Sequence, residues 1–443
     1  MSRSRHGLLL LVSATGCAIL LPQPSMESVP RGASEMAFKA GAARVALTPV
    51  GHPVPLAGFG PDPVMTDKVE SELHARAVSL RGEAEIDSGV DRVVLVSVDM
   101  LIIHRSFAEL VRRHLADLPR TRVILTATHT HFGIGGFWKG TLPEWASIGK
   151  FDPSETARVA SLVAACARAA VAAEAPCTVA RGSARHPELV SSRVAHTHLV
   201  DDEMLALAVD TPSGARVATL VFFAAHPTEL YGLDYLSGAW PGAACEELER
   251  RGGVALLFQQ GIGDQKCSFP PELFENFAPV YSEGKVAKSH AYGLGVARAA
   301  TAALESSVPV SAPSLRLACA TYELHPPSLG ACPIPLLDRL LALPVVLPYW
   351  PRRTTVTSLR IGDAAVAFAP FELCAASTLR AKRRLRAAGF GDAAVVSFAD
   401  DWLGYAPDFL PLFWTTSGAA SFGGAGIGYS VADRLVELGE RLR

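Results

Sequence analysis

Hydrophobic and polar positions along the chain follow two different periods. Unbroken apolar, β-branched runs such as DRVVLVSVD (residues 91–99) and ARVATLVFFAA (residues 215–225) are typical of buried strands. Segments between such runs, for example ETARVASLVAACARAAVAAEA (residues 155–175), have the spacing of helices. Because strands alternate with longer helical segments, the pattern predicts an α/β protein with mixed β-sheets flanked by helices.

The same pattern places the individual elements. Strands are expected over residues 38–49, 77–83, 91–103, 122–131, 204–210, 215–227, 254–261 and 393–401, with a hairpin over 358–372. Helices are expected over residues 105–117, 155–175, 242–252, 283–305 and 373–389, the first with Ser106 as its N-cap. The sequence shows no internal repeat and no low-complexity linker. Residues 37–443 are therefore expected to form a single large domain.

The first 36 residues have the layout of a leader and linker. Basic MSRSRH is followed by the short apolar run GLLLLVSATGCAILL, which is typical of a secretory signal. Ala14-Thr15-Gly16-Cys17 resembles a bacterial lipobox, so two outcomes are open: lipidation at Cys17, or cleavage near QPSMESVPRGAS. Either outcome predicts an exported protein that is secreted, periplasmic or lipid-anchored to the bacterial cell envelope. An oxidising compartment permits a disulfide, for which Cys319 and Cys332 are one candidate pair.

Composition narrows the class of protein. Hydrophobic residues make up 49% and charged residues 19% of the 443 positions, which excludes a disordered chain. The 41 Lys and Arg against 43 Asp and Glu leave a net charge of −2, which argues against a nucleic-acid partner. The Pro-rich, apolar segment 324–351 is expected to pack as an insertion between strands, or else to form a lip or lipid-contacting patch near an active-site mouth.

Histidines and a glutamate at the ends of apolar strands are the candidate chemistry. THTHFGIGGF (residues 128–137) presents His129 and His131 together on one face where the strand ends in a Gly-rich loop, because side chains two apart in a strand point the same way. His226 and Glu372 each end another strongly apolar strand. Imidazoles joined by a carboxylate are the mixed ligand set of a zinc site. A helix-start charge is the alternative for Glu372.

Six segments resemble, in the same order, the motifs of one enzyme family. ATHTHFGIGGF is similar to the HTHSGPGG(Y/F) signature of the neutral/alkaline, non-lysosomal ceramidases. The other five are ELVSSRVAHTHLVDDEMLALAVD, FFAAHPTELYGLDYLSGAWPG, QQGIGDQKCSFP, AFAPFELCAASTLRAKRRLR and FADDWLGYAPD. The resemblance runs from about Phe38 to about Gly428. It identifies the chain as a divergent member with the family's N-terminal catalytic domain and without the immunoglobulin-like domain of longer members.

The resemblance implies a zinc amidase that cuts the N-acyl bond of ceramide into fatty acid and sphingosine. By motif position, Zn²⁺ would be held by His129, His226, Glu372 and Tyr405. His131 would act near the reacting carbonyl and pass a proton to the leaving amine. Arg193 would hold the polar head or the oxyanion.

Two aspartates are candidates for supporting roles. Asp264 in the GIGDQ loop, or equally Asp99, could orient a ligand imidazole. Each could instead cap a helix or a turn.

Departures from the family motifs leave the substrate open. The family's GDVSPN stretch has Lys266 and Ser268 here, the serine of THTHSGPGG is Phe132, and the YEGAST element reads WTTSGAAS. Another acyl amide or ester is therefore an alternative substrate, and a catalytically inactive, surface-anchored lipid-binding protein is an alternative function. An amidohydrolase barrel would need further ligands at later strand ends. Phe-Gly-Ile-Gly after HTH is inconsistent with a metallo-β-lactamase. The oligomeric state is not predicted.

Overall fold

The structure is a computed structural model that describes residues 38–82, 89–194, 199–269, 284–310, 314–327, 346–408, 421–424 and 426–443. The chain divides into two units, Met1–Glu35 and Met36–Arg443, and every described element belongs to the second. Cys17, Cys332 and most of the WTTSGAAS segment lie outside the described residues. Where the structure describes the chain, no helix is long and apolar enough to cross a membrane.

Three large sheets share one strand arrangement. In each sheet, the first three strands along the chain pair antiparallel and the fourth pairs parallel to the third. The first sheet contains β1 (Lys39–Ala46), β4 (His74–Arg81), β5 (Arg92–Val98) and β6 (Thr121–Ala127). The second contains β8 (Thr178–Arg185), β10 (Glu203–Asp210), β11 (Arg216–Phe223) and β12 (Val254–Gln259). The third contains β15 (Leu315–Glu323), β16 (Arg353–Ile361), β17 (Ala364–Phe368) and β19 (Asp392–Val396). Short edge strands β7 (Ala175–Pro176) and β14 (Val308–Val310) extend the first two sheets.

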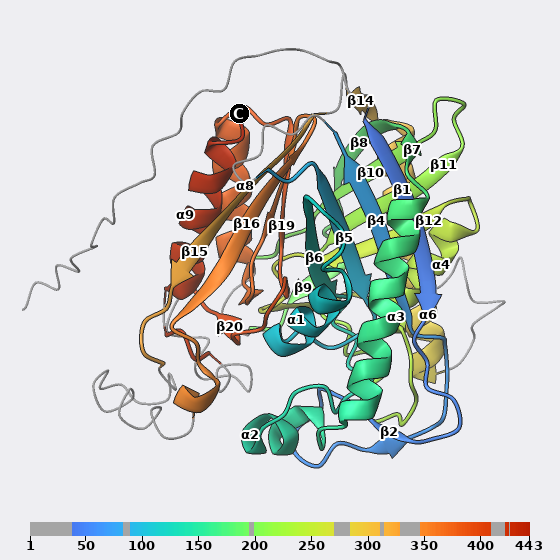
Figure 1. Ribbon diagram of the computed structural model, residues 1–443, viewed down its shortest axis with the longest axis vertical. Coiled ribbons are helices and arrows are strands. Elements are labelled where there is room, and N and C mark those ends of the chain that lie inside the picture. Colours follow the sequence, from blue (N-terminus) through green and yellow to red (C-terminus); the bar gives the residue numbers. More distant parts are fainter. Residues whose placement is uncertain are drawn as a thin grey trace, which may run out of the picture. The chain divides into compact units, whose positions relative to one another are not determined.

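The helices follow the same threefold pattern (Figure 1). One helix connects the two parallel strands of each sheet: α1 (Arg105–His114), α4 (Ala239–Glu249) and α8 (Ala375–Ala387). A second helix follows the last strand: α3 (Pro153–Ala172), α6 (Gly284–Glu305) and α9 (Ile427–Glu440). The fold is thus a β-β-β-α-β-α topology used three times. The repeat is not visible in the sequence. Each copy requires only that apolar residues recur with the spacing of its strands and helices, and different residues meet this requirement in each copy.

The two faces of each sheet belong to different cores. Val93 and Leu95 of β5 point into a shared core that also contains Phe222 of the second sheet and Val366 of the third. Residues between them, such as Val94, pack on the other face, against α1 and α3. The second and third sheets likewise pack their outer faces on their own helix pairs. The prediction of an α/β fold with mixed sheets flanked by helices is therefore confirmed. None of the described sheets forms an immunoglobulin-like sandwich.

Two local predictions need correction. The N-cap of α1 is His104, not Ser106, because the His104 side chain accepts from the backbone N–H of Ser106. The hairpin expected over 358–372 is formed by β16 and β17 and ends at Phe368, so Glu372 lies beyond it. The Pro-rich segment 324–351 is described only at its ends, where Trp350 packs into the third sheet's outer core and Leu347 is exposed.

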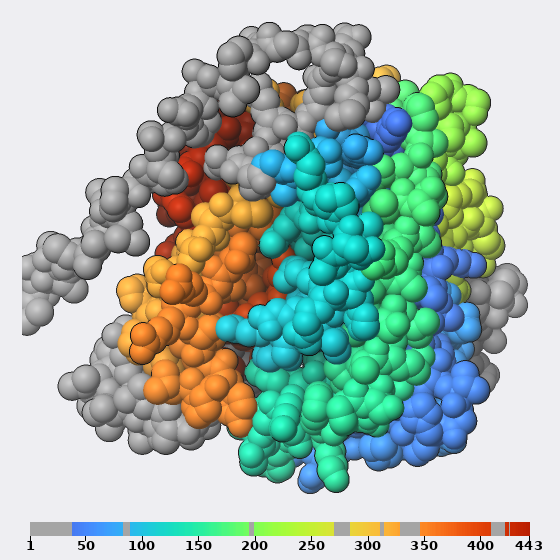
Figure 2. All heavy atoms as spheres, viewed as in Figure 1, coloured from blue at the N-terminus to red at the C-terminus, as the bar shows by residue number. Residues whose placement is uncertain are grey.

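Short elements gather where β1, β6, β8, β11, β12, β15, β17 and β19 end. We call the loops at this end of the three sheets the strand-end face. It carries β2 (Val54–Pro55), β3 (Met65–Thr66), α2 (Thr141–Pro143), η1 (Glu144–Ile148), β9 (Val190–Ser192), β13 (Gln265–Cys267), η2 (Leu347–Tyr349), β18 (Glu372–Leu373) and β20 (Tyr405–Ala406). In Figure 2, its blue, green and orange parts lie along the lower edge.

Candidate metal centre

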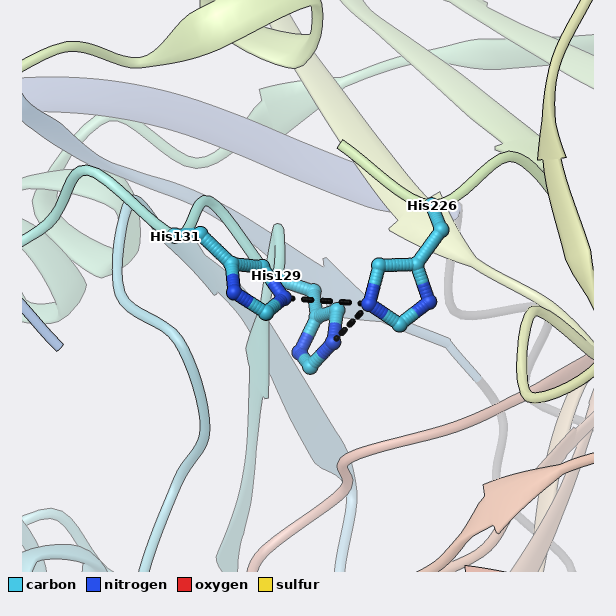
Figure 3. A group of neighbouring side chains, drawn as sticks. All are labelled: His129, His131 and His226. Atoms are coloured by element: carbon cyan, nitrogen blue, oxygen red, sulfur yellow. Dashed lines mark hydrogen bonds between the residues drawn. The ribbon is translucent and has the colours of Figure 1, made fainter. Parts of the chain in front are cut away.

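Three imidazoles meet at the strand-end face, from two different sheets. His129 and His131 follow β6, and His226 follows β11. The Nε2 atom of His226 lies 3.2 Å from Nε2 of His129 and 3.0 Å from Nε2 of His131 (Figure 3). All three side chains are buried, and their ligand atoms lie within 4.8 Å of one another. Such a group could hold a metal ion.

The backbone at the two adjacent histidines differs from the expected strand. β6 ends at Ala127, and His129 has φ of +64°, in the left-handed region that non-glycine residues seldom adopt. The two rings converge through this kink and not through the side-chain alternation of an extended strand. Their planes are 85° apart with centroids separated by 4.9 Å. Backbone strain of this kind is commonly found at functional sites.

Backbone carbonyls fix the tautomers of two rings. His129 donates from Nδ1 to the carbonyl of Leu101 at 2.6 Å, and His131 donates from Nδ1 to the carbonyl of Gly58 at 3.0 Å. With the proton on Nδ1, each Nε2 carries a lone pair that points toward His226. Two lone pairs directed at the same place can both bind a cation there.

Burial keeps these imidazoles uncharged. Desolvation lowers the pKa of His131 to about 3, and the nearby Arg193 guanidinium adds to the effect. The pKa values of His129 and His226 are also held well below the usual value, in each case chiefly by desolvation. Neutral imidazole is the form that binds metal, so none of the three rings has to lose a positive charge before a metal binds at neutral pH.

Glu372 and Tyr405 complete an oxygen side of the site. They are paired residues of the parallel ladder between β18 and β20. The Glu372 atom Oε1 is buried without a hydrogen-bond partner, 3.8 Å from Nε2 of His129 and 3.5 Å from Nδ1 of His226. Burial raises the pKa of Glu372 to about 7, although Arg193 and the Tyr405 hydroxyl oppose the shift. A buried carboxylate oxygen left unpaired beside imidazole nitrogens fits a divalent metal ligand.

Arg193 lies against the same groups. Its Nη1 atom is 2.7 Å from Nδ1 of His226, and its side chain also interacts with Tyr405 and Glu372. A guanidinium only donates, so His226 accepts this bond at Nδ1 and carries its proton on Nε2. For His226 to bind a cation through Nε2, the proton has to move to Nδ1, where the Ile262 carbonyl lies 3.4 Å away. The nitrogen and carboxylate donors fit a divalent metal, and binding through Nε2 of His226 would require Arg193 to give up its bond to Nδ1.

The two candidate aspartates lie behind the imidazoles. The Asp264 carboxylate accepts from the backbone N–H of Ala375 at 2.8 Å, at the start of α8. No hydrogen bond or ion pair between Asp264 and a histidine occurs among the described residues, so the geometry matches the helix-capping alternative. Asp99 accepts from the Thr128 hydroxyl at 3.1 Å and from buried Arg76 at 3.1 Å. It holds the residue that precedes His129 and does not touch the ring.

Further residues at the site carried no signal in the sequence. Phe398 stacks on the His129 ring with centroids 4.2 Å apart and planes 15° apart. Phe59 lies 4.9 Å from His131, and its ring also contacts Phe132 and Tyr231. These rings surround the imidazoles with apolar side chains. The positive φ at Phe398 has no marker in the sequence, whereas Phe59 lies between two glycines of positive φ.

Comparisons of sequence find relatives of the first half of the chain. Residues 38–255 match the sequence model described as neutral/alkaline non-lysosomal ceramidase, N-terminal. A neutral ceramidase of Mycobacterium tuberculosis (strain ATCC 25618 / H37Rv) is 27% identical over 220 residues, which are 45% of this chain and 33% of that protein. The match thus spans about a third of the length of this curated relative.

Solved structures extend the likeness to almost the whole chain. The crystal structure of neutral ceramidase from Pseudomonas aeruginosa superposes with a TM-score of 0.76 at 17% identity, covering 92% of this chain and 75% of that one. A ceramidase complexed with C2 gives a TM-score of 0.74 at 17% identity, covering 92% and 76%. At this identity the superpositions establish the fold alone. Together with the match over residues 38–255, they show that the chain belongs to the neutral/alkaline non-lysosomal ceramidase family, as a divergent member.

Proposed function

We propose that the protein is a zinc-dependent hydrolase that cleaves the N-acyl amide bond of a lipid-like substrate, with ceramide as the leading candidate. The observation that carries this proposal is the buried cluster of His129, His131 and His226, beside which lie the unpaired Glu372 oxygen and Tyr405, its partner in the β18–β20 ladder. The residues lie near the ends of all three large sheets, and His129 and Tyr405 are 276 positions apart (405 − 129). A chance cluster of this chemistry would leave buried polar groups unpaired at a cost in stability.

Zinc held by these four residues would polarise the scissile carbonyl and lower the pKa of a bound water to about 7. Side chains of the protein then accept and donate the protons of the reaction. His131 has its Nδ1 proton bound to Gly58 and no proton on Nε2, so Nε2 can take a proton from the attacking water. It can pass this proton to the leaving nitrogen as the C–N bond breaks, which releases an acid and an amine. We assign Arg193, which interacts with Tyr405, the role of donating to the developing oxyanion.

An aromatic wall supports a substrate with an apolar chain. Phe59, Phe132 and Tyr231 form a ring cluster next to His131. Phe132 replaces the family's serine and is completely buried, and it packs with Leu230 and Ala239. The hydroxyl of the family motif is thus replaced by a buried ring that supports Phe59, and the polar head group of the substrate stays open. A different acyl amide or an ester is the second candidate substrate on this ground.

The cellular location remains part of the proposal. The leader-like residues 1–36 support export, with secretion, a periplasmic location or a lipid anchor at Cys17 as the forms this could take. An exported hydrolase would meet lipid substrates in the cell envelope or outside the cell.

Hydrolysis of a fluorescent N-acylsphingosine, of short acyl amides and of acyl esters tests the proposal. We expect turnover that chelation removes and that Zn²⁺ restores. His226→Ala should lose turnover, whereas His114→Ala should retain it, because His114 is an exposed residue at the end of α1. Stoichiometric zinc without turnover on any acyl amide or ester would instead favour the catalytically inactive lipid-binding protein. Turnover that is unaffected by chelation and by His226→Ala would contradict the proposed mechanism.

A further inference from the structure

Exposed apolar side chains are concentrated on the strand-end face. Of the ten large hydrophobic residues that are exposed in the described part of the chain, nine lie on this face. Val64, Met65, Trp145 and Tyr231 are each more than half exposed. The tenth, Val308, lies on β14 at the edge of the second sheet. Single exposed apolar residues are normal, but their segregation to one end of a molecule marks an interaction surface.

Exposed lysines are segregated in the same way. Among the described residues, the exposed lysines are Lys68, Lys139, Lys150, Lys266, Lys285 and Lys288, and all six lie on the strand-end face or in the first turns of α6, which starts there. The remaining two lysines are the half-buried Lys39 at the start of β1 and the buried Lys382, which pairs with Asp201. The apolar residues and the lysines therefore occupy one end of the sheets.

Lysines contact tyrosine residues on this face. The Lys285 ammonium donates to the carbonyl of Tyr231, and Lys68 lies over the Tyr235 ring at 5.8 Å. A lysine stem can cover apolar surface while its ammonium reaches water or a phosphate, and tyrosine has the same two-sided character. Lysine beside aromatic and aliphatic side chains is typical of proteins that lie in the interface of a bilayer.

This surface is continuous with the imidazoles. The Tyr231 ring lies 5.0 Å from the Phe59 ring, which lies 4.9 Å from His131. The neighbouring Gly58 donates its N–H to the Ser147 carbonyl at 2.9 Å, which joins the loop of Phe59 to η1 and so to the segment that carries Trp145. The exposed Tyr231 ring is thus joined to the candidate metal centre through contacting aromatic rings.

We propose that the strand-end face is a membrane-binding surface on which Val64, Met65 and Trp145 enter the lipid interface while the lysines contact headgroup phosphates. The inference deepens the proposed function, because it gives a water-insoluble acyl substrate a route from the bilayer to the site. Exposed Asp62 and Asp67 lie among the lysines, so apolar contact and not net positive charge dominates binding. Binding should therefore persist on zwitterionic vesicles and depend only weakly on salt.

Co-sedimentation with phosphatidylcholine vesicles that contain no substrate tests the inference. The full chain with Cys17→Ser and the unit Met36–Arg443, which supplies all the described cores, are measured side by side. We expect binding by both, and about tenfold or greater weakening in the combined variant Val64→Ser, Met65→Ser and Trp145→Ser, since three exposed apolar side chains are removed. The matched control is Val308→Ser, which removes an equally exposed apolar residue outside the face and should bind like the wild type.

Two readouts separate this inference from the proposed function. Absence of vesicle binding by Met36–Arg443, or equal binding by the combined variant, would overturn the membrane-binding surface even if a soluble short-chain substrate is hydrolysed. Vesicle binding without hydrolysis of any acyl substrate would leave the surface standing and contradict the proposed function. A concentration-dependent dimer that the combined variant abolishes, with no vesicle binding, would assign the face to a second copy of the chain and overturn the inference.

Discussion

Glu372 and Tyr405 are paired residues of a two-residue parallel ladder, and their side chains interact inside the candidate metal centre. The pairing explains how a carboxylate and a phenol that are far apart in sequence reach one point. Burial and the adjacent carboxylate raise the pKa of Tyr405, so the phenol is neutral without a metal. A ligand role for the phenol oxygen therefore depends on a cation beside it.

Tyr405→Phe tests this role. The change removes one oxygen and its interactions with Glu372 and Arg193 while the ring stays in place. We expect metal affinity to fall by about 10- to 100-fold, as for other groups that tune metal ligands. Titration with zinc and a competing chelator measures the effect. Tyr322→Phe is the control, because its hydroxyl only bonds Ser430 away from the site. Unchanged zinc affinity in Tyr405→Phe would exclude the phenol as a ligand.

Gly58→Ala tests the position of His131. A Cβ atom at residue 58 would lie 2.4 Å from Nδ1 of His131, and φ of +119° is itself unfavourable for alanine. The imidazole must shift and lose its bond to the Gly58 carbonyl, so kcat should fall by about 100-fold. Gly60→Ala has φ of +82° but nothing within 4 Å of the added atom, so it separates backbone strain from displacement of the ring. Equal activity of the two variants would show that the His131 position is unimportant.

Asp264→Ala distinguishes a catalytic from a capping aspartate. The carboxylate accepts from Ala375 at the start of α8, two residues beyond β18. Loss of this bond should reduce the free energy of unfolding by about 1 kcal/mol and leave most of kcat. Asp152→Ala, which removes the N-cap of α3, is the matched change. If Asp264→Ala abolishes turnover at unchanged stability, the catalytic role predicted from the sequence is correct.

The ion pair of His290 and Glu70 predicts a pH dependence of stability. Nε2 of His290 lies 2.7 Å from Oε1 of Glu70. The hydrogen bond to Glu70 raises the pKa of His290, and bonds to His290 and Ser237 lower the pKa of Glu70 although burial opposes that shift. The raised pKa of His290 gives stability that is present below about pH 6.5 and is lost as the pH rises through the folded value. The lowered pKa of Glu70 gives stability that is present above about pH 4.3 and is lost as the pH falls through the folded value.

Chemical denaturation of the wild type and His290→Asn checks this window. The two free energies of unfolding should differ most near pH 6, by about 1 kcal/mol, and converge at alkaline pH, above the raised pKa of His290. The opposite trend, with a larger difference at alkaline pH, would contradict the ion pair.

The sequence predicted the strands and helices because their burial follows local periods. Val93 and Leu95 point inward and Val94 outward, as an alternating strand requires. The candidate ligands were found because each follows an apolar strand, where a polar side chain is costly without a partner. That these residues lie close together could not be derived from the spacing of apolar residues. Tyr405 was identified as a candidate ligand only through the resemblance to a family.

Other features of the site depend on contacts between distant residues. The positive φ of His129 and the stacking of Phe398 on its ring arise where the first and third sheets meet. Asp264 could be interpreted as a ligand-orienting group or a cap, and only the position of Ala375 distinguishes the two. The threefold topology was missed because no residue identity repeats with it.

Metal content after purification is the decisive measurement for the proposed zinc site. We expect close to one zinc per chain in the wild type by inductively coupled plasma mass spectrometry, and almost none in His129→Ala or His226→Ala. His131→Ala should retain zinc and lose turnover, although its Nε2 lies only 3.0 Å from that of His226. Loss of zinc in His131→Ala would make His131 a ligand and contradict its assignment as the proton carrier. A wild-type protein that binds no divalent metal would contradict the account as a whole.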